Sequence, residues 1–192
     1  MAKPGEKIEA SSIGETIIFL QTEKGTNGDF VQAERILKPR SGFIREHYHL
    51  NQGTRTEVIS GKAAYKLNGV NMVATSGEVV IIPPKAKHID PWNNSDEELR
   101  MLIEARPAQG VEVLFETWYG LARDHRHITK KGQLNLLQIA LTIHSIPLTA
   151  YILPKVVQDF FTPVSAFIAR LFGYKPYYPE YSDPADYPWM EK

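Results

Sequence analysis

The sequence predicts a mainly β protein that carries a helical extension, and two observations lead to this prediction. Turn signals rich in Gly, Asn, Ser and Pro separate short runs of Ile, Val and Thr before Pro107, as in a barrel or sandwich of short strands. After Pro107 the apolar residues follow a helical spacing instead. We therefore divide the 192 residues into a β-barrel over 1–106 and a helical extension over 107–192. The extension ends in a tail rich in Tyr and Pro.

Several runs before Pro107 have the length and composition of strands. Asn68 and Gly69 separate two of these runs, and this pair predicts a hairpin because both central residues of its turn adopt positive φ. Similar turn signals separate the other runs. The predicted strands cover 16–21, 30–37, 43–49, 54–59, 63–67, 70–74, 79–82, 87–90 and 99–105.

Two amphipathic helices are predicted in the extension. Apolar residues from Val111 to Ala122 recur at i, i+3 and i+4, with charged residues opposite. A further helix is predicted after Thr162, which would be its N-cap. Pro163 suits the first helical position, and Gly173 suits the position just beyond the end.

The stretch from Gly132 to Leu153 lies between these helices and contains no Asp, Glu, Lys or Arg. Its length approaches that of a membrane-spanning helix. Polar residues recur along it at helical spacing and Pro147 interrupts it, so we interpret it as a buried or interface helix. Lysines flank the stretch, so peripheral contact with a membrane surface stays open, although we do not favour it.

Composition excludes several kinds of site and partner. There is no cysteine, which excludes disulfides, zinc–thiolate sites and a thiol nucleophile. Lys+Arg and Asp+Glu are both 22, and a formal net charge of +0 argues against a nucleic-acid partner. The first ten residues contain no apolar run, so we expect a cytoplasmic protein.

Three histidines form the main functional pattern. His47 and His49 are two residues apart on a predicted strand, so their side chains project from the same face. His88 lies on another predicted strand. Three imidazoles that converge inside a barrel would form a metal site with open positions for a ligand, and the lack of cysteine restricts the donors to nitrogen and oxygen.

These residues resemble the two sequence motifs of the cupin family. The first motif matches in its histidine pair and closing glycine, and the second matches in its leading glycine, its proline and its histidine. The matching residues are His47, His49, Gly61, Gly77, Pro83 and His88. The resemblance covers about half of the chain. It implies a small β-barrel of jelly-roll topology, usually a homodimer, in which the three histidines bind Fe, Ni, Cu, Mn or Zn.

One departure from the family pattern concerns the metal. The family's metal-binding glutamate falls on Thr54, and strand alternation places the nearest acid, Glu57, on the opposite face. Three histidines without an acid still suit several transition metals, and some cupin-like dioxygenases work with such a set. Two functions therefore stay open. One is a metal-dependent enzyme of the dioxygenase or isomerase type that acts on an apolar or aromatic small molecule. The other is a metal-free cupin that binds a hydrophobic ligand as a sensor or carrier.

Four further residues are predicted to contact the substrate. Arg45 is two residues before His47 on the same predicted strand, so its side chain should point to the same side as the histidine pair. It could bind an anionic group, although a structural ion pair is the alternative. Gln52 could donate to a bound ligand or stabilise a turn. Thr54 faces the same site. Trp92 could wall the pocket or pack in the core. The helical extension could cover the barrel mouth, form the dimer interface or contact a membrane.

Overall fold

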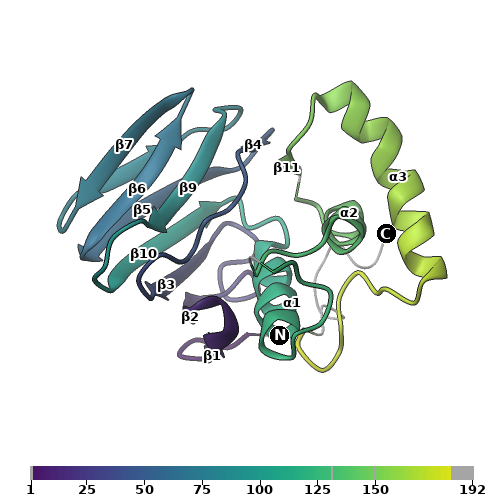
Figure 1. The fold of residues 1–192 in the computed structure, drawn as a ribbon, viewed down its shortest axis with the longest axis horizontal. Helices are drawn as coiled ribbons and strands as arrows, with labels where there is room; N and C mark the ends of the chain where they lie inside the picture. Colours follow the sequence, from purple (N-terminus) through teal and green to yellow (C-terminus); the bar gives the residue numbers. More distant parts are fainter. Residues whose placement is uncertain (1, 131, 149, 183–192) are drawn as a thin grey trace.

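The structure, a computed structural model, describes residues 2–130, 132–148 and 150–182. Its antiparallel strands form a barrel of two facing sheets, and three α-helices follow at one side (Figure 1). The larger sheet has the order β1-β2-β3-β10-β5-β8, and the smaller has the order β7-β6-β9. The mainly β fold class with a helical extension is confirmed.

The elements have the following bounds. The strands are β1 (Lys7–Ala10), β2 (Glu15–Gln21), β3 (Val31–Leu37), β4 (Tyr48–His49), β5 (Gly53–Ser60), β6 (Lys62–Leu67), β7 (Val70–Thr75), β8 (Val79–Ile82), β9 (His88–Asn93), β10 (Leu99–Arg106) and β11 (Ala150–Tyr151). The helices are α1 (Val111–Arg123), α2 (Leu136–Ser145) and α3 (Lys155–Leu171), and a short 3-10 helix covers Ser11–Ile13.

The strands predicted before Pro107 are present, with two differences, and the short strand β11 of the extension was not predicted. β1 was not predicted, because its four residues include only one large apolar side chain, Ile8. The strand predicted over 43–49 forms a ladder only at β4, and His47 instead makes an isolated bridge to His88. The predicted hairpin joins β6 to β7 through Asn68 and Gly69, whose φ angles are 49° and 88°.

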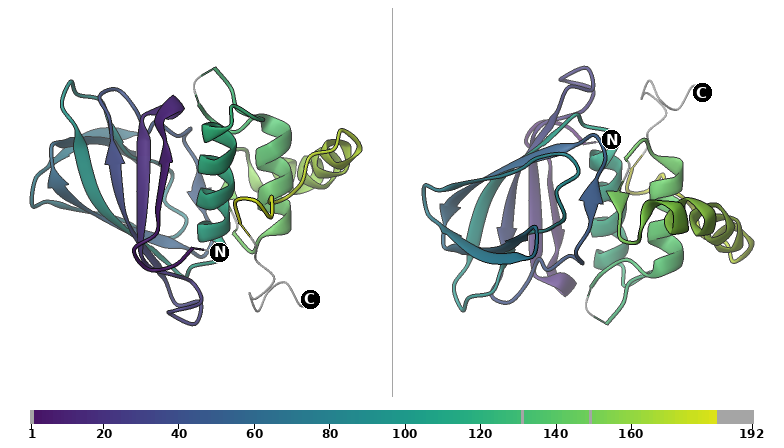
Figure 2. Two further views of the ribbon diagram at one scale, coloured as in Figure 1. Left: turned by 90° about the horizontal axis from the view of Figure 1, so that it is seen from below. Right: turned by 90° about the horizontal axis from the view of Figure 1, so that it is seen from above.

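The extension shares a hydrophobic core with the barrel. Ile17 and Phe19 of β2 belong to the same buried cluster as Trp118 and Tyr119 of α1. Figure 2 shows α1 lying beside β1 and β2. A separate cluster that includes Val58 lies between the two sheets. α1 is therefore held against the barrel by apolar burial as well as by the chain connection.

The prediction of a helix that starts at Thr162 is wrong, because α3 starts at Lys155 and contains Pro163 in its interior. A proline inside a helix removes one backbone hydrogen bond. Burial of Ala166 and Ala169 against Leu141 of α2 supports the helix beyond this point. The local start signal at Thr162 and Pro163 is thus overridden, and the helix runs through both residues.

α2 confirms the interpretation of the uncharged stretch as a buried or interface helix. The side chain of Asn135 caps it by accepting a hydrogen bond from the backbone N–H of Gln138 at 2.9 Å. Leu141 is fully buried, as that interpretation requires. None of the helices in the described part of the chain is long and apolar enough to cross a membrane.

The predicted tail packs on the helices as far as it is described. Tyr178 is buried, and its hydroxyl donates to the side-chain oxygen of Gln138 at 3.1 Å. The rest of the tail, with Tyr187 and Trp189, lies outside the described residues.

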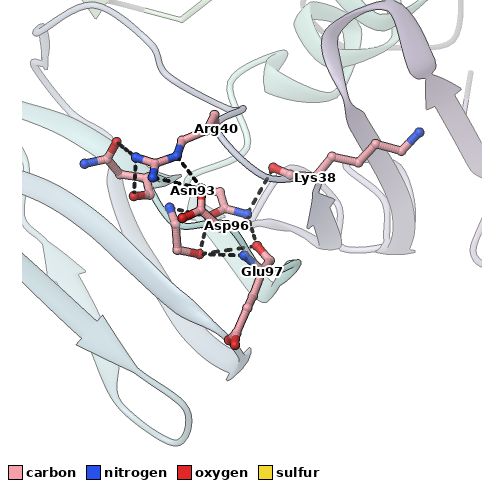
Figure 3. A network of polar contacts seen from close by, with 7 residues as sticks. Lys38, Arg40, Asn93, Asp96 and Glu97 are labelled. Atoms are coloured by element: carbon pink, nitrogen blue, oxygen red, sulfur yellow. Dashed lines mark hydrogen bonds and ion pairs between the residues drawn. The ribbon is translucent and has the colours of Figure 1, made fainter.

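A polar network fixes the end of β9, the strand that begins with His88. Asn93 is fully buried and donates to the carbonyl oxygens of Leu37 and Lys38 at 3.0 Å each and of Glu97 at 2.7 Å. Figure 3 shows this network beside the exposed pair of Arg40 and Asp96. Because the two N–H groups of one buried amide are shared among three backbone carbonyls at the end of β3 and just before β10, the end of β9 is held next to both strands.

Candidate metal centre

The three histidines that the sequence singles out lie together. The backbones of His47 and His88 exchange two hydrogen bonds of 2.8 Å, and His49 follows on β4. Their side chains are buried, with exposed fractions of 8%, 7% and 1% for His47, His49 and His88. One ring nitrogen from each lies within 4.8 Å of the other two. Three separate positions along the chain thus contribute donors to one point.

Backbone carbonyls determine which nitrogens are free to bind a metal. Nδ1 of His47 lies 2.8 Å from the carbonyl oxygen of Arg45, and Nδ1 of His88 lies 2.8 Å from that of Ala86. A carbonyl oxygen only accepts, so each Nδ1 carries the hydrogen and each Nε2 presents a lone pair. In the described structure, Nε2 of His88 is buried and has no hydrogen-bond partner. This is the tautomer that a metal-binding imidazole requires.

The spacing of one nitrogen pair fits a shared metal ion. Nε2 of His47 lies 3.1 Å from Nε2 of His49. Two imidazole nitrogens bound at a right angle to one ion, each at about 2.1 Å, would be separated by about 3 Å. Burial lowers the pKa of His47 and, together with the neighbouring imidazole of His47, lowers that of His49 to about 3. Both rings are therefore neutral at neutral pH, as metal ligands must be.

An acidic residue that sequence analysis missed lies beside two of the three histidines. Asp90 follows His88 by two residues on β9, with Oδ2 3.5 Å from Nε2 of His47 and Oδ1 3.6 Å from Nε2 of His88. Burial opposes ionisation of this carboxyl, but the nearby imidazoles lower its pKa overall. The signal was available, because a His-x-Asp spacing on a strand places both side chains on one face.

Thr54 and Glu57 lie on opposite faces of β5, as strand alternation predicts. Thr54 lines a cavity beside the histidines, and in the described structure its hydroxyl oxygen is buried without a hydrogen-bond partner. Glu57 instead pairs with Arg55 at 2.9 Å, and its side chain is 40% exposed. Glu57 is therefore not available to replace the missing family glutamate.

The cavity, of about 170 Å³, lies between the barrel and the extension. His47, His49 and Asp90 form part of its wall. The extension contributes apolar side chains to the opposite wall, among them Val111, Leu114, Phe115, Trp118, Ile139 and Ile143. The extension therefore covers the mouth of the barrel.

The predicted substrate-contacting residues differ in position. Arg45 lines the cavity and is exposed, and its guanidinium makes no ion pair with any described residue. Gln52 also lines the cavity, but its amide nitrogen donates to the carbonyl oxygens of Pro107 and Ala108 at 2.7 and 3.1 Å. It therefore ties the barrel to the extension, and any contact with substrate stays a prediction.

Trp92 contacts another aromatic side chain in the structure. Trp92 is not among the described residues that line the cavity. Its ring makes an edge-to-face contact with Phe43, with centroids 5.4 Å apart. This contact favours the alternative of a packing aromatic, and a role of Trp92 in substrate binding stays a prediction.

A buried charged group in the cavity wall was also missed. Arg35 of β3 lines the cavity and is 3% exposed. Its Nη2 atom lies 2.5 Å from Oε2 of Glu15. The hydroxyl of Tyr119 donates to the same carboxylate at 2.7 Å. Tyr119 belongs to α1, so nothing near Arg35 in the sequence indicated that this charge is neutralised inside the protein.

The barrel topology and the site together determine the fold family. Two antiparallel sheets carry the two motifs on adjoining segments, and the histidines of both motifs meet at one point inside. The chain has the cupin fold. No family model matches the chain.

Several solved cupin structures are similar to the chain. An RmlC-like cupin from Shewanella frigidimarina aligns with a TM-score of 0.47 and 17% identity, covering 59% of this chain and 93% of that one. A sugar phosphate isomerase of the cupin superfamily from Silicibacter pomeroyi aligns with a TM-score of 0.43 and 16% identity, covering 52% and 64%. A predicted oxalate decarboxylase from Thermotoga maritima aligns with a TM-score of 0.43 and 16% identity, covering 52% and 97%.

A curated relative is similar in sequence. An oxidoreductase from Arthrobotrys oligospora is 26% identical to this chain over 153 residues, which are 71% of this chain. The aligned part spans 58% of the length of that relative.

Proposed function

We propose that this cupin is a metal-dependent enzyme of the dioxygenase or isomerase type that acts on an apolar or aromatic small molecule. The observation that carries the proposal is the meeting of three buried histidine nitrogens within 4.8 Å of one another, with two of the three histidines, His47 and His49, in the wall of a largely apolar cavity. The relative from Arthrobotrys oligospora is named an oxidoreductase, which favours oxidation over isomerisation.

Each part of the site has a distinct task in this proposal. His47, His49 and His88 would hold a divalent ion of Fe, Ni, Cu, Mn or Zn, and the carbonyls of Arg45 and Ala86 keep two of the rings in the required tautomer. The bound ion would supply Lewis acidity and, for a redox metal, electron transfer. The apolar side chains of α1 and α2 would bind the body of the substrate and exclude water.

Metal reconstitution tests the proposal. Protein stripped with a chelator is loaded with each of the five metals, freed of excess ion and analysed for metal content. We expect about one ion per chain for at least one metal, lost in His47→Ala and retained in His144→Ala, since His144 is an exposed histidine on α2. If the wild-type protein retains none of the metals, the proposal is wrong.

Turnover separates an enzyme from the alternative of a ligand-binding sensor or carrier. The loaded protein is screened with apolar and aromatic small molecules for oxygen consumption and for isomeric products. We expect turnover of at least one compound that disappears in His47→Ala. Binding of such compounds without turnover, equal in the loaded and metal-free protein, would favour the carrier.

A further inference from the structure

Asp90 places a carboxylate at the three-histidine centre, although the family position for that group is occupied by Thr54. Its two oxygens lie 3.5 and 3.6 Å from the Nε2 atoms of His47 and His88. These are its only ion-pair contacts in the described part of the chain. We propose that Asp90 is the fourth protein ligand of the metal centre, an inference that rests on the proposed function.

The hydrogen-bonding roles of these groups support a cation between them. The carbonyls of Arg45 and Ala86 hold the ring hydrogens of His47 and His88 on Nδ1, so both Nε2 atoms are acceptors. An ionised carboxylate also only accepts. Nε2 of His47 can accept a hydrogen from Nε2 of His49 at 3.1 Å, whereas Nε2 of His88 has no hydrogen-bond partner among the described residues. A metal ion would bind these nitrogens and the carboxylate together and so remove the repulsion between acceptors that face one another.

The geometry favours Asp90 over the other oxygen in the site. A nitrogen and an oxygen bound side by side to one ion at about 2.1 Å each lie about 3 Å apart, so the carboxylate is within about half an ångström of ligand distance from two histidines. Thr54 offers only a neutral hydroxyl. Asp90 therefore restores the negative charge that Thr54 does not supply, from β9 instead of β5.

The assignment changes the expected metal chemistry. Three nitrogens and one carboxylate oxygen carry one negative charge, which increases the affinity for a divalent ion relative to three neutral imidazoles. Four protein donors leave two positions of an octahedral ion open for substrate or a second reactant. Because His88 and Asp90 share β9, which Asn93 anchors, these two donors would be held rigidly.

Metal affinity of Asp90→Asn tests the inference without an assay of activity. Metal-free wild type, Asp90→Asn and Glu57→Gln are titrated with Zn²⁺ and Ni²⁺ against a competing chelator, and Co²⁺ absorption spectra report the donor set. We expect Asp90→Asn to weaken binding about 10- to 100-fold and to change the Co²⁺ spectrum. Glu57→Gln removes an exposed acid on the opposite face and is expected to match wild type.

A second variant separates loss of a ligand from damage to the fold. Asp90→Asn combined with Thr54→Glu places a carboxylate at the family position, and we expect it to recover at least part of the lost affinity. Failure to recover affinity in a double variant that melts at the wild-type temperature would overturn the inference.

The failures of the two proposals are distinguishable. Unchanged affinity in Asp90→Asn, with binding lost in His47→Ala, would overturn the role of Asp90 and leave the three-histidine metal centre standing. Absence of binding in the wild type would overturn the metal-dependent function and the role of Asp90 together.

Discussion

Ala150 lies opposite His49 in a short antiparallel pair, so the helical extension adds a strand to the segment that carries a candidate metal ligand. The next residue, Tyr151, stacks on Tyr48 with ring centroids 5.3 Å apart. Its hydroxyl donates to Asp159 of α3 at 2.9 Å. The position of the extension over the cavity is therefore coupled directly to β4.

Truncation of Tyr151 should loosen this connection. We expect Tyr151→Ala to lower the free energy of unfolding by about 2–4 kcal/mol, because the ring is largely buried. Amide hydrogen exchange in residues 150–158 should become faster. Tyr151→Phe keeps the stack and loses only the hydroxyl contact, so it should cost about 1 kcal/mol. Equal effects of the two variants would show that the stack does not hold the extension.

Neutralisation of Glu15 should leave the guanidinium of Arg35 buried without a counter-charge. We expect Glu15→Gln to lower the free energy of unfolding by about 3–5 kcal/mol in urea denaturation, since a buried ion pair is broken on one side only. The matched control is Glu57→Gln, which breaks an exposed pair with Arg55 and should cost less than about 1 kcal/mol. Similar losses in the free energy of unfolding for Glu15→Gln and Glu57→Gln would contradict a buried charge at Arg35.

The buried imidazole of His49 should make the metal-free protein sensitive to acid. Burial lowers its pKa from 6.5 to about 3, so between these values the unfolded chain binds a proton that the folded chain does not. Above pH 6.5 His49 is neutral in both states, so it does not lower the free energy of unfolding. As the pH falls from 6.5 toward 3, protonation of His49 in the unfolded chain lowers the free energy of unfolding progressively. Between pH 7 and pH 5 we expect wild type to lose about 2 kcal/mol more than His49→Gln, measured by urea denaturation with a chelator.

A control at an exposed histidine accompanies this measurement. His144 on α2 is exposed, so His144→Gln should keep the wild-type dependence on pH. If the free energy of unfolding depends on pH in the same way in wild type and in His49→Gln, His49 is protonated in the folded chain at pH 5.

Enlargement of Ala166 should disturb the contact between α2 and α3. Ala166 is fully buried in a cluster with Leu141, and the neighbouring Phe167 is 61% exposed. We expect Ala166→Leu to cost about 1–3 kcal/mol through overpacking. Phe167→Leu on the outer face should change the stability by no more than about 0.5 kcal/mol. If Phe167→Leu destabilises the protein more than Ala166→Leu in thermal or urea denaturation, α3 packs on α2 through the face that carries Phe167.

Local chemistry allowed much of the barrel and part of the site to be predicted. The turn at Asn68 and Gly69 depends on the φ preferences of those two residues, so it is readable from the sequence. The common face of His47 and His49 follows from strand alternation. Their convergence with His88 followed from the family resemblance, because spacing along the chain does not reveal which strands adjoin.

Contacts between distant residues decided the rest. Asp90 becomes a candidate metal ligand only because folding brings Nε2 of His47 to 3.5 Å from its carboxylate. The charge of Arg35 is tolerated because β2 and α1 supply Glu15 and Tyr119.

The sequence by itself determined the short strands, the main turn and the nitrogen donors, because backbone preferences and side-chain alternation act over a few residues. Only the tertiary structure decided where α3 begins, what covers the cavity and which acid meets the histidines. Those features depend on burial and on charge contacts between segments that are far apart in the chain.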